Sequence, residues 1–255
     1  MTLNFNSEKV IKIAVKAGKA ILDIYNNPEL SSEVDIKSDK SPLTLADKAS
    51  HEVIMRELQG NFEYPIMSEE SDPGDYVKRK GWETYWLVDP LDGTKEFIKR
   101  NGEFTVNIAL IHNREPVFGV IYVPVRETLY FGASMDGAFK KVGDKLEKLE
   151  VNKRSDKRIA VRSKSHASDE EEEVLSRYNV VGTISKGSSL KFCMVAEGKA
   201  DIYYRHGPTM EWDTAAGQAI LLAAGGRMYH GQSAKDKFRY NKEELLNGSF
   251  LCLGF

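Results

Sequence analysis

The segment "YWLVDPLDGTKEF", residues 85–97, places two carboxylates three residues apart at the end of an apolar run. Asp89 precedes a proline, which favours an extended backbone, so we expect Asp89 to close a strand. Asp92 is placed to cap a short helix whose first backbone N–H groups, at Gly93 and Thr94, have no helical acceptor. Carboxylates bind hard divalent cations such as Mg²⁺, one aspartate can bridge two ions, and a helix N-terminus can hold a phosphate. The segment alone fits a metal and phosphate site, and equally a strand end followed by a turn and a capped helix.

The same segment lacks the nucleophile that a covalent phosphatase mechanism requires. "LDGT" is similar to the DxDGT motif of haloacid-dehalogenase-type phosphatases, in which the first aspartate is the nucleophile. The residue two positions before Asp92 is Pro90, which cannot attack phosphorus. The covalent alternative therefore lacks its nucleophile.

Three other segments supply acids that could join this pair. "IMSEES" contains Glu69 and Glu70 after a short strand-like segment, and "EWDTAAG" contains Asp213 at the start of an apolar helix. "SPLTLADKA" contains Thr44 and Asp47 in the Thr-x-x-acid arrangement of a helix capping box. Taken singly, these residues also fit solvated loop acids, a helix cap and a capping box.

The N-terminal half has helical periodicity first and strand patterns afterwards. Apolar residues recur every three or four positions from about Asn6 to Tyr25, and again after "SPLT", which predicts two amphipathic helices joined by a polar connection from "NNPEL" to "SDKSP". Short β-rich runs separated by turn residues then predict consecutive antiparallel strands. These runs are "TYWLV", "FTVNIALI", "PVFGVIYVP", "TLYFGA" and "GAFKKV".

The C-terminal half alternates strands and helices, which indicates an α/β layer. The charged segment 143–157 is the expected boundary between a domain at 1–150 that carries the metal site and a domain at 151–255 that contacts the substrate. The acidic run Glu170–Glu173 is expected in the solvated first turn of a helix. The predicted strands are "RIAVRS", "NVVG", "DIYYR", "RMYH" and "SFLCLGF", and the helices are "SDEEEEVLSRY", "SSLKFCMVAEG" and "MEWDTAAGQAILLAAGG".

Composition excludes several classes of protein. With 255 residues, 41% hydrophobic content and a net charge of −2, the chain can bury a core and has no overall basic footprint, so we expect no nucleic-acid partner. No stretch is long and apolar enough for a spanning helix and no signal sequence is evident, which predicts a cytoplasmic protein and leaves peripheral attachment to the inner membrane open. Cys193 and Cys252 lack metal or disulfide spacing and are expected to be buried fillers.

The joint occurrence of five motifs resembles a known family. "SPLTLADKA", "MSEES", "DPLDGTKEF", "GSSLKFCMVAEGKADIYYR" and "EWDTAAGQAIL", in this order, resemble the inositol monophosphatase superfamily of Mg²⁺-dependent, Li⁺-inhibited phosphatases. Within it, "DGTKEF" and "WDTAAG" resemble CysQ-type 3′(2′),5′-bisphosphate nucleotidases, whereas inositol monophosphatases more often carry Thr-Asn after the Gly-Thr. The resemblance implies an α/β fold, the layered αβαβα sandwich of the sugar and inositol phosphatases, and the common occurrence of homodimers.

The resemblance also implies two to three Mg²⁺ ions. Glu69, Asp89 and the carbonyl of Leu91 match the ligands of one ion, and Asp89, Asp92 and Asp213 match those of a second, with Asp89 as the bridge. A third, weaker ion is implied near Glu69.

Catalytic roles follow from the same matches. Asp47 and Thr94 match positions linked to the attacking water, and Glu69 joins them as a catalytic residue beside the third ion. Glu70 matches a position that orients the metal ligands without binding the metal.

Substrate contacts are implied at two places. Around the metals they are Leu91, Asp92, Gly93, Thr94 and Asp213. In the C-terminal half they are Ser188, Lys191 and Arg205, and more weakly Ser165 or His166. Ser188 also fits a helix cap, and Lys191 and Arg205 also fit surface charges.

These matches predict hydrolysis of adenosine 3′,5′-bisphosphate to AMP and phosphate, which would clear the by-product of sulfate activation or sulfo transfer. One alternative is the same chemistry on an inositol monophosphate, a fructose bisphosphate or another sugar phosphate. The other is a metal- or nucleotide-binding module without activity, which would have no need of Asp47 and Thr94 beside the metal ligands.

Overall fold

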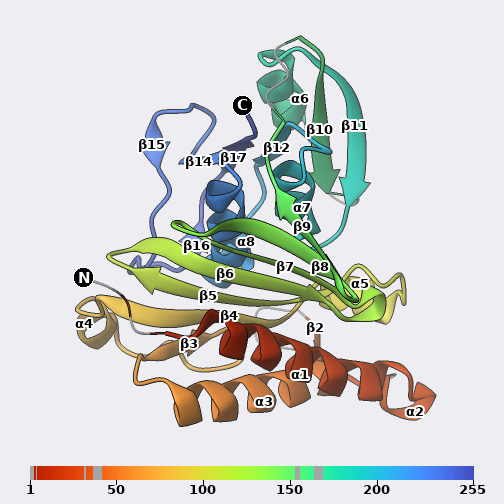
Figure 1. Cartoon of the computed structure of the whole chain (residues 1–255), viewed down its shortest axis with the longest axis vertical. Coiled ribbons are helices and arrows are strands. Elements are labelled where there is room, and N and C mark those ends of the chain that lie inside the picture. The colour runs from red at the N-terminus through yellow and green to blue at the C-terminus, as the bar shows by residue number, and fades with distance from the viewer. Residues whose placement is uncertain (1–2, 4, 32, 37–41, 153–155, 164–168) are drawn as a thin grey trace.

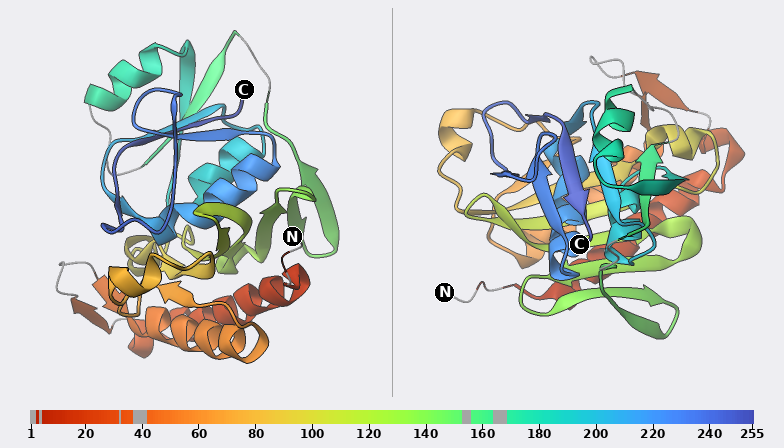
Figure 2. Two further views of the ribbon diagram at one scale, coloured as in Figure 1. Left: turned by 90° about the vertical axis from the view of Figure 1, so that its left-hand side faces the viewer. Right: turned by 90° about the horizontal axis from the view of Figure 1, so that it is seen from above.

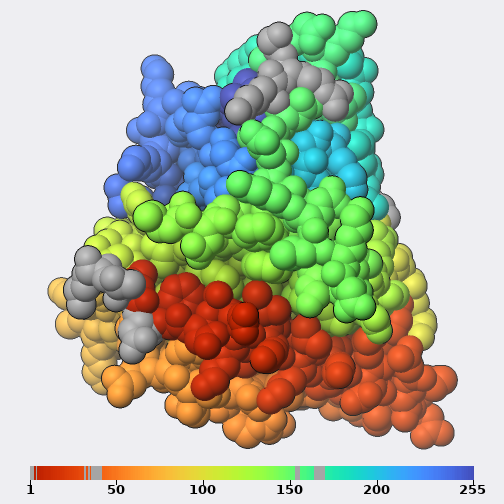
Figure 3. Space-filling view, in the orientation of Figure 1, coloured from red at the N-terminus to blue at the C-terminus, as the bar shows by residue number. Residues whose placement is uncertain are grey.

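Three helical layers alternate with two β-sheets in the computed structural model, which describes residues 3, 5–31, 33–36, 42–152, 156–163 and 169–255 (Figure 1). The predicted α/β fold, a layered αβαβα sandwich, is confirmed. In the space-filling view the N-terminal helices lie at one end, the C-terminal half lies at the other, and the first sheet lies between them (Figure 3).

The first layer consists of α1 (Ser7–Tyr25) and α3 (Leu45–Asn61), the two predicted amphipathic helices. α1 begins where the Asn6 side chain accepts a hydrogen bond from the backbone N–H of Lys9 at 3.1 Å. Its buried stripe, which extends from Val10 to Tyr25, packs on strands of the first sheet. The predicted polar connection between these helices contains a short helix and two antiparallel strands that were not predicted. These elements are α2 (Pro28–Ser31), β1 (Val34–Ile36) and β2 (Pro42–Thr44).

The first sheet has seven strands in the order β3-β4-β5-β6-β7-β8-β9. The five predicted strands are consecutive and antiparallel, as expected, and β3 is parallel to β4. The charged segment predicted as a boundary contains a further strand, β9, because its alternating "KLEKL" pairs with β8. The strands are β3 (Ile66–Ser68), β4 (Thr84–Asp92), β5 (Thr105–His112), β6 (Glu115–Val123), β7 (Thr128–Ala133), β8 (Gly137–Val142) and β9 (Lys145–Leu149), with α4 (Tyr76–Arg79), α5 (Thr94–Ile98) and the 3₁₀ turn η1 (Pro124–Arg126) in the connections.

The middle layer, α7 (Leu190–Ala196) and α8 (Glu211–Ala223), lies between the two sheets (Figure 2). The second sheet has the order β11-β10-β12-β17-β14-β15, and α6 (Asp169–Ser176) covers its outer face. Its strands are β10 (Arg158–Ser163), β11 (Val180–Lys186), β12 (Ile202–Arg205), β14 (Arg227–His230), β15 (Asp236–Lys237) and β17 (Phe250–Leu253). The pair β13 (Thr209–Met210) and β16 (Leu246–Asn247) was not predicted, and neither was β15.

Several smaller predictions can be compared with the structure. Cys193 and Cys252 are buried and free, as expected. Within the acidic run, Glu171 is buried and bonded to Arg162, so a fully solvated face was wrong for that residue. No helix among the described residues is long and apolar enough to cross a membrane. The core between the sheets draws side chains from both 1–150 and 151–255, and the division into two domains stays a prediction.

The middle layer approaches the first sheet closely at Gly119 of β6. A Cβ atom at this position would lie 2.5 Å from the carbonyl oxygen of Ala216 and 2.9 Å from its Cα in α8. Both are backbone atoms, so the whole helix would have to move.

We expect Gly119→Ala to lower the free energy of unfolding by about 1–3 kcal/mol, because the added methyl pushes α8 off the sheet. Urea denaturation would measure this loss. Gly60→Ala in α3 is the matched control, since nothing lies within 4 Å of its added Cβ. That helical substitution should be neutral or stabilising by up to about 1 kcal/mol. Equal urea midpoints for Gly119→Ala and the unmodified chain would contradict the prediction.

Candidate metal and phosphate site

Carboxylates from three separate elements converge at one edge of the first sheet. Glu69 follows β3, Asp89 lies in β4, and Asp213 lies in the first turn of α8. Each offers one oxygen, and these three oxygens all lie within 4.8 Å of one another. Asp89 is only 1% exposed. The structure thus brings together three of the four acids predicted as metal ligands, and Asp92 lies beside them on the wall of the same cavity.

The backbone between Asp89 and Asp92 is an irregularity within a strand. β4 continues to Asp92, and its register with β5 shifts between the two aspartates, so the prediction that Asp89 ends the strand was wrong. The Asp89 carboxylate accepts a hydrogen bond from the N–H of Leu91 at 3.0 Å, and Ser50 donates to the carbonyl of Pro90 at 2.7 Å. These contacts fold the segment so that both acids line one cavity.

Asp92 does not cap the helix that follows it, contrary to prediction. Gly93 is the N-terminal cap of α5, in the left-handed region at φ +96°, and makes no side-chain cap bond. One Asp92 oxygen instead accepts from the Ser188 hydroxyl and the Ser189 N–H, both at 2.6 Å, and from the Asn107 amide at 3.3 Å. Asp92 therefore joins the first sheet to the loop that precedes α7.

Sequence reasoning missed the residues that hold this loop. The Thr105 hydroxyl lies 2.7 Å from the Ser188 hydroxyl and 2.8 Å from that of Ser189, and Ser189 also bonds to Asn107 at 2.9 Å. Ser189, not Ser188, is the N-terminal cap of α7. A signal was present, because Thr105 and Asn107 are buried polar residues in an otherwise apolar strand.

Burial and like charge disfavour ionisation of the cluster. Burial, followed by the carboxylates of Glu69, Asp92 and Asp213, raises the pKa of Asp89 well above its usual value. The pKa of Asp213 is raised as well, first by burial and then by Asp92 and Glu69. Several carboxylates crowded in this way are stable together when a cation lies among them. The donor set consists only of oxygen, so it fits a hard divalent ion such as Mg²⁺.

Asp47 and Thr94 form a second polar unit at the edge of the cluster. Asp47, 2% exposed, accepts at one carboxylate oxygen from the N–H of Thr44 at 2.7 Å and from its hydroxyl at 2.5 Å. The other oxygen accepts from the Thr94 hydroxyl at 3.3 Å. The capping box predicted for Thr44 and Asp47 is present, and it leaves one oxygen of Asp47 for Thr94.

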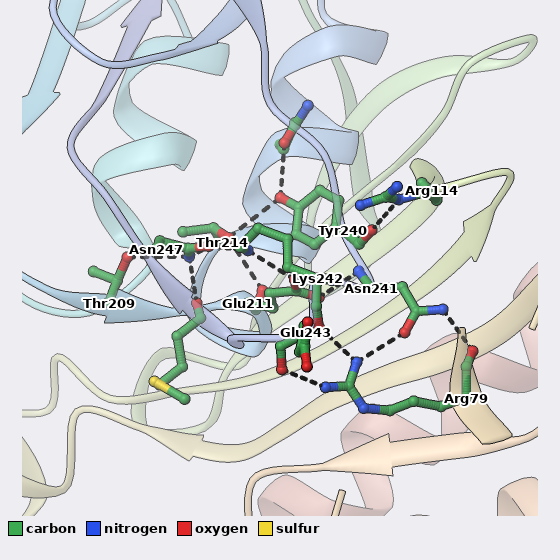
Figure 4. A network of polar contacts seen from close by, with 12 residues as sticks. Arg79, Arg114, Thr209, Glu211, Thr214, Tyr240, Asn241, Lys242, Glu243 and Asn247 are labelled. Atoms are coloured by element: carbon green, nitrogen blue, oxygen red, sulfur yellow. Dashed lines mark hydrogen bonds and ion pairs between the residues drawn. The ribbon is translucent and has the colours of Figure 1, made fainter. Parts of the chain in front are cut away.

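The start of α8, which carries Asp213, is fixed by a buried ionic network (Figure 4). Glu211 is fully buried and accepts from the backbone N–H groups of Asn241 and Lys242 and from the Lys242 ammonium at 2.7 Å. Asn241 in turn bonds to Arg79. Met210, not Asp213, is the N-terminal cap of α8, and Asp213, the third residue of the helix, accepts from the N–H of Met210 at 2.8 Å. The network therefore fixes the turn of α8 from which Asp213 reaches the cluster.

Basic and hydroxyl groups line an adjoining cavity of about 170 Å³. Ser188, Lys191 and Arg205 line it, as the predicted substrate contacts should, together with Ser163, which was not predicted. Lys191 is 7% exposed, and burial lowers its pKa to about 8. Its ammonium donates to the carbonyl of Ser188 at 2.6 Å, so it is not a surface charge.

The larger cavity, of about 520 Å³, lies over the acids. Among the predicted residues it is lined by Glu69, Asp89, Leu91, Asp92, Gly93, Thr94, Arg205 and Asp213. Glu70 lies near His51 and Lys48, whose protonated forms it favours, and does not line this cavity. Its orienting role stays a prediction. Ser165 and His166 lie outside the described residues.

Comparison with known proteins identifies the family. The model of the inositol monophosphatase family matches residues 6–250. The 3′(2′),5′-bisphosphate nucleotidase CysQ of Salmonella typhimurium is 46% identical over 244 residues, covering 95% of this chain and 97% of that protein. The protein of the same name from Escherichia coli K12 is 45% identical with the same coverage. Among solved structures, CysQ from Bacteroides thetaiotaomicron is 47% identical, with a TM-score of 0.86 and 99% of each chain covered.

The chain belongs to the inositol monophosphatase family. The predicted resemblance, including its CysQ-type character, is thereby confirmed.

We expect Asp89→Asn to raise the free energy of unfolding by about 1–2 kcal/mol in the absence of divalent cations, because it removes one buried like charge. Mg²⁺ should raise the melting temperature of the unmodified chain and leave that of the variant nearly unchanged. Thermal unfolding with and without Mg²⁺ would measure both effects. Asp136→Asn, at an exposed turn, is the matched control and should keep the Mg²⁺ response.

The same acids predict a pH dependence. A carboxyl whose pKa is higher in the folded chain binds its proton more tightly there, so stability without divalent cations should fall as pH rises from about 4 through the raised pKa. This loss of stability with rising pH should be smaller in Asp89→Asn, because the variant lacks one of the carboxyls with a raised pKa. Stability that rises with pH over this range in the unmodified chain and not in the variant would contradict the assignment.

Proposed function

We propose that this chain hydrolyses the 3′-phosphate ester of adenosine 3′,5′-bisphosphate, giving AMP and phosphate. The observation that carries the proposal is the cavity with Lys191 and Arg205, which opens directly beside the acid cluster. A monophosphate ester of inositol needs only the acids, whereas a nucleotide with two phosphates needs a second cationic site. Relatives that are 45–46% identical over 95% of the chain are 3′(2′),5′-bisphosphate nucleotidases, which supports the same reading.

The acid cluster is proposed to hold Mg²⁺, with Glu69, Asp89 and the Leu91 carbonyl around one ion and Asp89, Asp92 and Asp213 around another. Bound there, Mg²⁺ would supply Lewis acidity toward the phosphoryl oxygens and increase the acidity of a water molecule. A third, weaker ion near Glu69 is part of the same proposal. The chain contributes a fixed set of oxygen donors whose mutual repulsion the cations relieve.

Thr94 and Asp47 are proposed to position and deprotonate the attacking water. The Thr94 hydroxyl donates a hydrogen bond to Asp47, so the hydroxyl oxygen can accept a hydrogen bond from a water in the cavity. Asp47 is held by Thr44 and can take up the proton that the water loses. The proton thus moves away from the phosphate along a fixed path.

The second phosphate is proposed to bind at Ser188, Lys191 and Arg205. The last two are cations, and Arg205 lines both cavities, so it can contact a substrate that spans them. Charged hydrogen bonds of this kind are the strong ones in phosphate recognition. A role in clearing a by-product of sulfate activation or sulfo transfer follows from the substrate. A cytoplasmic location and a homodimer stay predictions.

The test is phosphate release from adenosine 3′,5′-bisphosphate and from inositol 1-phosphate, side by side with Mg²⁺, and then with Li⁺ added. We expect faster release from the nucleotide, suppressed by Li⁺. Preference for the inositol ester would retain the metal site and overturn the second phosphate site. Release from neither substrate would overturn the catalytic proposal.

Lys191 predicts a pH dependence specific to the bisphosphate. Its pKa of about 8 lies below the ordinary value, so the ammonium loses its proton as pH rises through that value. At pH 7, Lys191→Met should lower kcat/KM for adenosine 3′,5′-bisphosphate by about 10- to 100-fold. The difference in kcat/KM between the unmodified chain and Lys191→Met should become smaller above pH 8, because the unmodified chain then loses the positive charge that the variant lacks.

The measurement is kcat/KM for adenosine 3′,5′-bisphosphate from pH 6.5 to 9.5 with both proteins. The effects of other titrating groups cancel in the ratio of the two kcat/KM values. Lys145→Met, at a lysine whose side chain is 79% exposed, is the control. A ratio that is constant over the whole range would show that Lys191 binds no phosphate.

A further inference from the structure

The segment "DGTKEF" has a Lys-Glu pair after Gly-Thr, and the glutamate of this pair, Glu96, has no role in the mechanism above. Glu96 lies in α5, one turn beyond Asp92. It lines both cavities, the one over the acids and the one with Lys191. Glu96 therefore lies beside the part of any substrate that connects the two.

Two glycines make room for the Glu96 side chain. A Cβ atom at Gly187 would lie 2.9 Å from the Glu96 Cγ, and one at Gly93 would lie 3.4 Å from a Glu96 carboxylate oxygen. Gly93 also needs its left-handed backbone. Side chains at these positions would displace the glutamate from the junction of the cavities.

The carboxylate of Glu96 has no hydrogen-bond or ion-pair partner among the residues that the structure describes. The other two acids common to both cavities are bonded, Asp92 to the Ser188 loop and Asp213 to Met210. Lys191 is near enough for Glu96 to favour its charged form, but its ammonium donates to the Ser188 carbonyl. An unpaired carboxylate beside two phosphates is unfavourable unless the substrate offers it a donor.

We propose that Glu96 is a specificity-determining residue that accepts a hydrogen bond from the 2′-hydroxyl of the substrate ribose. This inference rests on the proposed function. With the 3′-phosphate at the acids and the 5′-phosphate at Lys191, the ribose lies at the junction that Glu96 borders. The 2′-hydroxyl is the only free hydroxyl of that ribose and is adjacent to the reacting ester. Glu96 thereby selects ribonucleotides over deoxyribonucleotides.

The test compares kcat/KM for adenosine 3′,5′-bisphosphate with that for its 2′-deoxy analogue. A hydrogen bond to a charged acceptor corresponds to a preference of about 10- to 100-fold for the ribonucleotide in the unmodified chain. In Glu96→Ala the preference should fall to about 2-fold or less, because the ribonucleotide loses its acceptor and the deoxynucleotide loses a repulsive charge. Glu96→Gln, which keeps a neutral acceptor, should lie between them. Glu147→Gln, at an exposed glutamate of β9, is the charge-matched control.

The outcomes separate the inference from the function on which it rests. Turnover of the ribonucleotide by the unmodified chain supports the nucleotidase function whatever Glu96 does. No preference in the unmodified chain, or an equal loss on both substrates in Glu96→Ala, would overturn the 2′-hydroxyl contact. An unchanged preference combined with a higher Mg²⁺ requirement would assign Glu96 to metal binding instead. Melting temperatures of Glu96→Ala and Glu96→Gln close to that of the unmodified chain would exclude misfolding as the cause.

Discussion

The crowding of carboxylates around the buried Asp89 is the constraint around which this fold is arranged. Four acids crowd one edge of the first sheet, and burial raises the pKa of two of them. Acids on one flexible loop would move apart. Here they come from three parts of the chain, and a donor of the chain fixes one oxygen of three of them: Leu91 N–H for Asp89, Met210 N–H for Asp213, and the Ser188 loop for Asp92. The free oxygens then face one cavity, where cations can offset the repulsion.

Helix α8, which carries Asp213, connects the acids to the rest of the fold through its packing. It packs on the first sheet at Gly119 and on α7 at Gly217, where added Cβ atoms would lie 2.5 Å from Ala216 and 2.4 Å from Phe192. Its first turn carries a fully buried glutamate, Glu211, only two residues from Asp213. Glu211 forms an ion pair with Lys242 at 2.7 Å, whereas Asp213 has no ion pair within 4.0 Å among the described residues. The same turn of helix therefore carries one carboxylate with a bonded counter-charge and one that is proposed to bind a cation.

The sequence predicted most of the fold because its strands and helices carry clear periodicity, and the acids because their motifs are compact. It failed where contacts join distant segments. Asp92 has the spacing of a helix cap, yet its carboxylate is taken by a loop almost a hundred residues later, which no local pattern reveals. Thr105 and Asn107 lie in a strand recognisable by its apolar residues, so their polar partners were overlooked. The small strands β13, β15 and β16 are too short to show any period.

The two cavities share Asp92, Glu96, Arg205 and Asp213 and differ in other charged groups: Glu69 and Asp89 line only the larger cavity, and Lys191 lines only the smaller one. In the proposed reaction, cations held by the acids bind one phosphate and Lys191 binds the second. Burial lowers the pKa of Lys191 to about 8, so the ammonium is charged at neutral pH yet poorly solvated. A poorly solvated ammonium gains more from a phosphate than an exposed one, because less hydration is lost on binding. If the second phosphate binds at Lys191 as proposed, the fixed position of this cation relative to the acids makes recognition depend on the separation of the two phosphates as well as on each phosphate alone.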